Sequence, residues 1–164
     1  MATGDTAFGI ASQRAGMRVL PEAGMVDSWP LRSSLELAAE ARKVPGARRH
    51  ARHVLRAWGL PALSDDTELV VSELVSNAVA VSATIRREEI WLWLISDGRQ
   101  VLVLTWDASL DPPEIADPAA DAENGRGLLL VDAISERWGW YVPGEQPSAD
   151  APGQHGKVVW AVVQ

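Results

Sequence analysis

Two apolar runs separated by a short polar segment are the feature that most constrains the fold of this chain. Residues 90–95 and 101–106 consist almost entirely of branched, aromatic and other apolar side chains, which favour β-strands. Asp97-Gly98 lies between the two runs and is typical of the tight turn of a β-hairpin. The sequence therefore predicts an antiparallel strand pair in the middle of the chain.

The segment before this hairpin has the spacing of an amphipathic helix. Apolar residues recur every three or four positions over residues 45–58. Pro45 suits the first helical turn, Gly59 is a typical end, and Pro61 prevents continuation. The arginines of this segment either form a docking surface for an acidic partner or a solvated helix face, and we favour the solvated face.

A second helix is expected to start near Asp66. Asp65 and Glu68 have the spacing of a capping box, in which two side chains satisfy free backbone N–H groups. A wide apolar stripe follows and is expected to be buried: Leu69, Val70, Leu74, Val75, Ala78 and Val79.

Glu73 and Asn77 interrupt the apolar character of this second helix. Residues four apart lie on one helical face, so this carboxylate and this carboxamide are placed to act together on one ligand. A metal ion with the phosphate that it carries is such a ligand. The pair therefore suggests a nucleotide site, provided that the rest of the chain agrees.

Two later segments add polar groups at positions where ligands commonly bind. Asp107 directly follows the second run of the hairpin, so its carboxylate lies at a strand end. An irregular acidic loop is expected up to residue 124, because three prolines interrupt it and no periodicity persists. Gly125-Arg126-Gly127 then opens an apolar helical run, where backbone N–H groups and the helix dipole favour an anion. We interpret this segment as a candidate phosphate contact.

The remaining strands are expected at residues 34–39, 138–142 and 158–163. The predicted fold class is α/β (α+β), a two-layer sandwich with a mixed, largely antiparallel sheet of about five strands and three helices on one face. Residues 1–28 show no sustained period and are expected to form a flexible tail. Residues 29–164 are expected to form a single domain, since 47% hydrophobic residues suffice for one core.

Composition narrows the classes of function. The chain has no cysteine, which removes disulfides, thiolate catalysis and cysteine-based zinc sites, and its three histidines are scattered. A net charge of −7 argues against general nucleic-acid binding and favours a protein partner or a small ligand. No apolar run approaches the roughly 20 residues needed to cross a bilayer. We therefore expect a cytoplasmic protein.

In the order of these motifs the chain resembles the GHKL superfamily of gyrase-type ATPases and sensor kinases, whose ATP-binding domain is the Bergerat fold. It is most similar to the small single-domain branch of anti-sigma factor serine/threonine kinases and their regulatory relatives. The resemblance spans about residues 35–163 and is carried by four segments: residues 71–79 (VSELVSNAV), 125–128 (GRGL), 136–139 (ERWG) and 156–160 (GKVVW).

This resemblance implies roles for individual residues. Asn77 corresponds to the ligand of the Mg²⁺ ion that bridges the ATP phosphates, and Glu73 to the carboxylate that orients or deprotonates the attacking hydroxyl. Asp107 corresponds to the residue that accepts the adenine amino group. The segment that approaches the phosphates comprises Gly125, Arg126, Gly127 and Leu128.

The resemblance favours an ATP-binding serine/threonine kinase that phosphorylates an anti-anti-sigma-type antagonist protein, sequesters a sigma factor, or does both. The alternative is a non-catalytic regulatory module with weak or no ATP binding. It is supported by the apolar residues after Asn77, where relatives commonly carry a basic residue or histidine. A motor or topoisomerase fragment is disfavoured because it would need a further transducer domain, and a domain without a nucleotide site is the remaining possibility. Relatives often dimerise, so a homodimer is possible.

Overall fold

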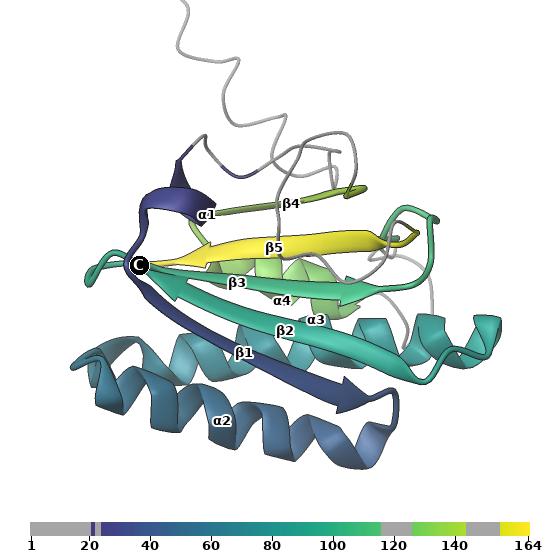
Figure 1. Ribbon diagram of the computed structural model, residues 1–164, viewed down its shortest axis with the longest axis horizontal. Helices are drawn as coiled ribbons and strands as arrows, with labels where there is room; N and C mark the ends of the chain where they lie inside the picture. The colour runs from purple at the N-terminus through teal and green to yellow at the C-terminus, as the bar shows by residue number, and fades with distance from the viewer. Residues whose placement is uncertain (1–20, 22–23, 116–125, 144–154) are drawn as a thin grey trace, which may run out of the picture.

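The computed structural model describes residue 21 and residues 24–115, 126–143 and 155–164. It is an α+β structure in which helices pack against one sheet (Figure 1). In chain order its elements are α1 (Met25–Ser28), β1 (Leu31–Ala38), α2 (Val44–Ala57), α3 (Ser64–Ile85), β2 (Glu89–Ser96), β3 (Val101–Asp107), α4 (Arg126–Ile134), β4 (Arg137–Tyr141) and β5 (Lys157–Val163). Short 3-10 turns at Ala41–Lys43 and Pro61–Leu63 precede α2 and α3.

The described strands form one five-stranded sheet in the order β1-β2-β3-β5-β4. Every pairing in it is antiparallel. The predicted hairpin is β2–β3, in which Ser96 pairs with Val101. Its turn is held by Asp97 Oδ1, which accepts hydrogen bonds from the backbone N–H groups of Arg99 and Gln100 at 2.8 and 2.9 Å. Gly98 takes a positive φ of 91°, which favours glycine.

Helices α2, α3 and α4 lie on one face of the sheet, as predicted (Figure 1). Side chains alternate between the two faces along a strand, so the odd-numbered residues of β3 and β5 face these helices. The main core between sheet and helices includes Val101, Val103, Val159 and Ala161, all buried. The same alternation places the last side chain of β3 and the first of β5 on the helix side, next to this core.

The opposite face of the sheet carries a second apolar cluster. It comprises Met25, Ile95, Leu102, Leu104, Trp106, Val158, Trp160 and Val162. Met25 belongs to α1, which lies within the segment expected to be a tail and packs onto the domain. Residues 1–20, 22 and 23 of that segment lie outside the described part of the chain.

Helix α3 does not begin with the predicted capping box. It starts at Ser64, and the preceding Leu63 makes no side-chain hydrogen bond to the helix end. Glu68 is only 3% exposed and instead accepts hydrogen bonds from Arg52 Nε at 2.8 Å, from Arg52 Nη2 at 2.6 Å and from Ser64 Oγ at 3.0 Å. The capping prediction is wrong because an arginine of α2 takes the Glu68 carboxylate. At least one arginine of α2 therefore joins two helices.

The expectation that no run approaches the length needed to cross a bilayer does not hold for one helix: α3 with its preceding turn, Pro61–Ile85, is long and apolar enough by length and composition alone. In the structure it is the central helix of the core, because Val70, Val71, Leu74 and Val75 are all buried between the sheet and the neighbouring helices.

The pair formed by Arg52 and Glu68 predicts a stability that depends on pH. The Arg52 guanidinium holds the pKa of Glu68 below its ordinary value of 4.5, against the opposing effect of burial. A depressed carboxyl pKa stabilises the fold above the ordinary value, and this contribution is lost as the pH falls through the folded-state pKa. Arg52→Met is therefore expected to lower the free energy of unfolding at neutral pH, and to lower it less at a pH below the folded-state pKa of Glu68.

Urea denaturation of wild type and Arg52→Met at neutral pH and at several values below 4.5 checks this prediction, with exposed Arg56→Met as the matched control on the same helix. The gap between wild type and Arg52→Met should shrink as the pH falls. A gap that is constant with pH, or equal for Arg56→Met, would contradict the assigned pair.

Candidate functional site

A cavity of about 540 Å³ lies between the C-terminal half of α3 and the segment that follows β3. Apolar side chains from α3, α4, β5 and this segment make up much of its wall, with polar groups at a few positions. The lining residues of α3 are Leu74, Asn77, Ala78, Ala80, Val81 and Thr84. The others are Asp111, Pro112, Pro113, Glu114, Ile115, Leu128, Lys157 and Val159. Small-molecule sites commonly have this size and this mixture.

Glu73 and Asn77 lie one turn apart on α3, as predicted, but they have different surroundings. Asn77 is partly buried and its side chain belongs to the cavity wall. Glu73, also partly buried, is not part of that wall and lies against the first turn of α4. A Cβ at Gly127 would overlap Glu73 Oε2, so the glycine allows the carboxylate to approach the α4 backbone. The two polar groups therefore lie on one helical face, Asn77 on the cavity wall and Glu73 beside α4.

The predicted phosphate-contact segment is described only in part. Gly125 lies outside the described residues, and Arg126 is exposed at the start of α4. Gly127 lies against Glu73, and Leu128 is buried with its side chain on the cavity wall. The structure thus brings Asn77 and Leu128 to one cavity, and it places Glu73 and Gly127 together beside it.

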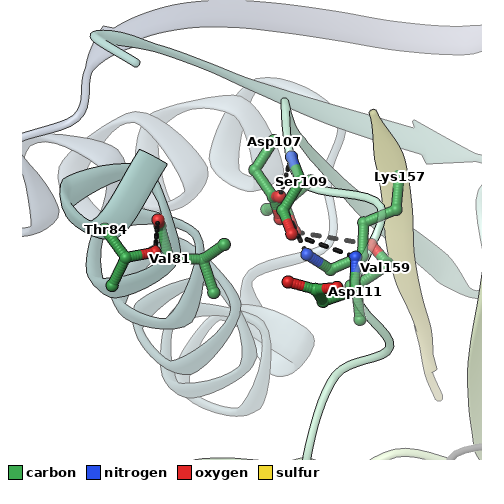
Figure 2. Close-up of polar contacts among 8 residues, drawn as sticks. Val81, Thr84, Asp107, Ser109, Asp111, Lys157 and Val159 are labelled. Atoms are coloured by element: carbon green, nitrogen blue, oxygen red, sulfur yellow. Dashed lines mark hydrogen bonds and ion pairs between the residues drawn. The ribbon is translucent and has the colours of Figure 1, made fainter. Parts of the chain in front are cut away.

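Asp107 ends β3 and is 3% exposed. Its Oδ1 accepts a hydrogen bond from the backbone N–H of Ser109 at 2.9 Å and an ion-pair hydrogen bond from Lys157 Nζ at 2.8 Å (Figure 2). Burial raises the pKa of the Asp107 carboxyl, while the positive charge and the hydrogen bond of Lys157 act in the opposite direction. Asp107 is thus a buried carboxylate held by a buried ammonium.

Lys157 lies between Asp107 and the cavity. It is 2% exposed, it is the residue opposite Asp107 in the β3–β5 register, and it lines the cavity, whereas Asp107 does not. Sequence reasoning assigned Lys157 no role. The available signal was a lysine at the start of an otherwise apolar strand, in a chain whose only other lysine is Lys43.

The segment after β3 is shaped by the side chains that follow Asp107. Ser109 Oγ accepts a hydrogen bond from the backbone N–H of Asp111 at 3.0 Å, next to the bond from Ser109 N–H to Asp107. Figure 2 shows Asp107, Ser109, Asp111 and Lys157 grouped across the cavity from the end of α3. This arrangement carries Asp111 and Glu114 to the cavity wall. Residues 108–115 contain no helix or strand, as predicted for this loop, and residues 116–124 of it lie outside the described part.

Gly156 is the residue that allows Lys157 to reach Asp107. Its φ is +152°, and a Cβ there would overlap the carbonyl oxygen of Asp107 and lie 2.6 Å from Trp106 Cε2. Both neighbours belong to the central strand of the sheet, so neither yields without disturbing it. Only glycine fits between β3 and the start of β5.

Gly156→Ala is therefore expected to lower the free energy of unfolding by about 3 kcal/mol, through overlap as well as backbone strain. Gly59→Ala is the matched control, because Gly59 also has a positive φ (73°) but open space around it, and it should cost only about 1 kcal/mol. Equilibrium denaturation of both variants measures the difference. Equal losses would mean that the close approach at Gly156 does not constrain the fold.

Comparison with known proteins is consistent with this geometry. The model of one protein family, described as Histidine kinase-like ATPase domain, matches residues 37–146, which is more than half of the chain. The matched range contains Glu73, Asn77, Asp107 and Gly127 and ends before Lys157. No curated protein was found to match the chain. Because the family match covers most of the α+β domain, the chain belongs to the histidine kinase-like ATPase domain family.

Proposed function

We propose that this chain binds Mg-ATP in the cavity beside α3 and acts as a serine/threonine kinase of the anti-sigma factor type. It would phosphorylate a small antagonist protein, sequester a sigma factor, or do both. The family to which the chain belongs implies ATP binding, usually with Mg²⁺. The observation that carries the proposal is that one cavity of about 540 Å³ is lined by both Asn77 and Lys157, the ion-pair partner of Asp107.

The residues present fit a magnesium nucleotide. Among the described residues, no group of three or more acidic or histidine side chains could hold a metal by itself. Mg²⁺ bound to a nucleotide needs no such group, because phosphates and waters supply most of its ligands. The Asn77 side-chain oxygen would be the protein ligand from α3. When bound, Mg-ATP supplies the γ-phosphoryl group and the cation that offsets its charge.

The position of Glu73 suggests where a protein substrate would approach. Its carboxylate lies against Gly127, at the junction of α3 and α4 and one turn from Asn77. A general base must come within hydrogen-bond reach of the hydroxyl that it activates. The acceptor serine or threonine would therefore enter at this junction. There, Glu73 orients the hydroxyl and takes its proton.

A regulatory module without catalysis is the second candidate, and the acidic cavity wall favours it. Asp111 and Glu114 both line the cavity and oppose a triphosphate unless a cation offsets them. The α3 residues after Asn77 that reach the wall are Ala78, Ala80, Val81 and Thr84, none of which offers a charge to phosphate. Such a module would act through the same protein partners. For both candidates we propose a cytoplasmic protein that can form a homodimer and that binds neither nucleic acid nor membrane directly.

Asn77→Ala tests the metal-ligand role. Calorimetric titration should show saturable binding of Mg-ATP to wild type, and the variant should bind about tenfold more weakly, because an oxygen ligand of Mg²⁺ is lost. The difference should narrow when ATP is titrated without Mg²⁺. Exposed Ser76→Ala on the same helix is the control and should bind as wild type does. If Asn77→Ala kept full affinity for Mg-ATP, the role assigned to Asn77 would be wrong.

Glu73→Gln separates the kinase from the regulatory module. The substitution keeps the size of the side chain but removes its basicity, so phosphoryl transfer should fall by about 100-fold or more while Mg-ATP affinity stays within about twofold. Wild type and variant are incubated with γ-labelled ATP and the native cytoplasmic proteins, and the labelled site is mapped. Binding without labelling by wild type would favour the regulatory module. Equal labelling by both proteins would exclude Glu73 as the base.

A further inference from the structure

Lys157 is a buried cation that the proposed phosphoryl transfer does not use. Only 2% of the residue is exposed, and its ammonium donates to Asp107 Oδ1 at 2.8 Å. Taking two opposite charges out of water carries a large desolvation cost before their attraction is counted, so such a pair is weak evidence of a purely stabilising role. An ammonium has three N–H donors, of which Asp107 Oδ1 takes one. Lys157 is therefore placed to donate into the cavity that it lines.

The surroundings of Lys157 suit a flat uncharged ring better than a phosphate chain. Val81, Ile115 and Val159 line the same cavity and offer apolar surface to the faces of a ring. The ionisable groups at this place are Lys157, Asp107, Asp111 and Glu114, so three carboxylates face one ammonium. Their combined charge would repel a triphosphate but not a neutral nucleobase. The base, not the phosphate chain, is the part of a nucleotide that fits beside Lys157.

We propose that Lys157 is a specificity-determining residue that donates a hydrogen bond from Nζ to ring nitrogen N1 of adenine. This inference rests on the proposed function. Asp107 holds the ammonium in position, and Gly156 permits the close approach that this requires. Adenine presents the N1 acceptor directly beside its 6-amino donor. Lys157 lines the cavity and supplies the donor for N1, whereas Asp107 does not line it and holds that donor in place. Asp107, the carboxylate expected to accept the adenine amino group, thus acts together with Lys157, which lies nearer to the cavity.

An atomic change in the ligand tests this contact without altering the protein. Wild type is titrated by calorimetry with the Mg²⁺ complexes of ATP, 1-deaza-ATP, which has C–H in place of N1, and 7-deaza-ATP as the control analogue. Loss of a hydrogen bond from a charged donor should weaken 1-deaza-ATP binding by about tenfold to a hundredfold. Binding of 7-deaza-ATP should stay within about threefold of ATP. Equal affinities for ATP and 1-deaza-ATP would overturn the proposal.

Lys157→Met assigns the effect to this side chain. The variant should bind ATP and 1-deaza-ATP alike, whereas Lys43→Met, the same change at the exposed lysine, should keep the wild-type discrimination. The double variant Asp107→Asn/Lys157→Met removes both buried charges, so it preserves the test if Lys157→Met alone does not fold. If a folded variant still bound ATP more tightly than 1-deaza-ATP, Lys157 would be excluded as the donor to N1. If wild type bound no ATP at all, the proposed nucleotide function itself would be overturned. If wild type bound ATP and 1-deaza-ATP equally well, only the proposed contact with N1 would be overturned.

Discussion

The pairing of β3 with β5 is the contact on which both the fold and the candidate site depend. It joins residues 50 to 62 positions apart, and all the residues of both strands are buried. On the helix side, Val103 and Ala161 support α3, and the same register ends with Asp107 opposite Lys157. Because Gly156 lies against the Asp107 carbonyl, the pairing continues to the last residue of β3. The apolar core and the Asp107–Lys157 ion pair thus belong to the same strand pairing, with the ion pair at its end.

Helix α3 links this end of the sheet to the rest of the cavity. One face of the helix is buried in the core, through residues such as Val71 and Val75, while Asn77 and Val81 face the cavity. A buried helix is rigid, so the backbone positions from which its polar side chains extend are fixed. Glu73 lies outside the cavity and beside Gly127. The two polar residues of α3 thus lie in different surroundings, Asn77 on the cavity wall and Glu73 beside α4.

The parts of the structure that depend on local sequence could be predicted, and the parts that depend on distant contacts could not. The β2–β3 hairpin, the α2 and α3 helices and the positions of Asn77 and Asp107 follow from periodicity and turn residues close in sequence. The capping box failed because the partner of Glu68 is Arg52, on another helix. The Lys157–Asp107 pair also needs a register that no local pattern encodes. Ionic contacts between distant residues were thus the part of the structure that was hardest to predict from the sequence.

A structure of the chain with Mg²⁺ and a non-hydrolysable ATP analogue would show directly whether the cavity between α3 and the segment after β3 is a nucleotide site. We expect adenine between Val81 and Val159, with its N1 edge toward Lys157, and the metal beside Asn77. A nucleotide bound outside this cavity, or one with its phosphates beside Lys157 and Asp107, would contradict this expectation.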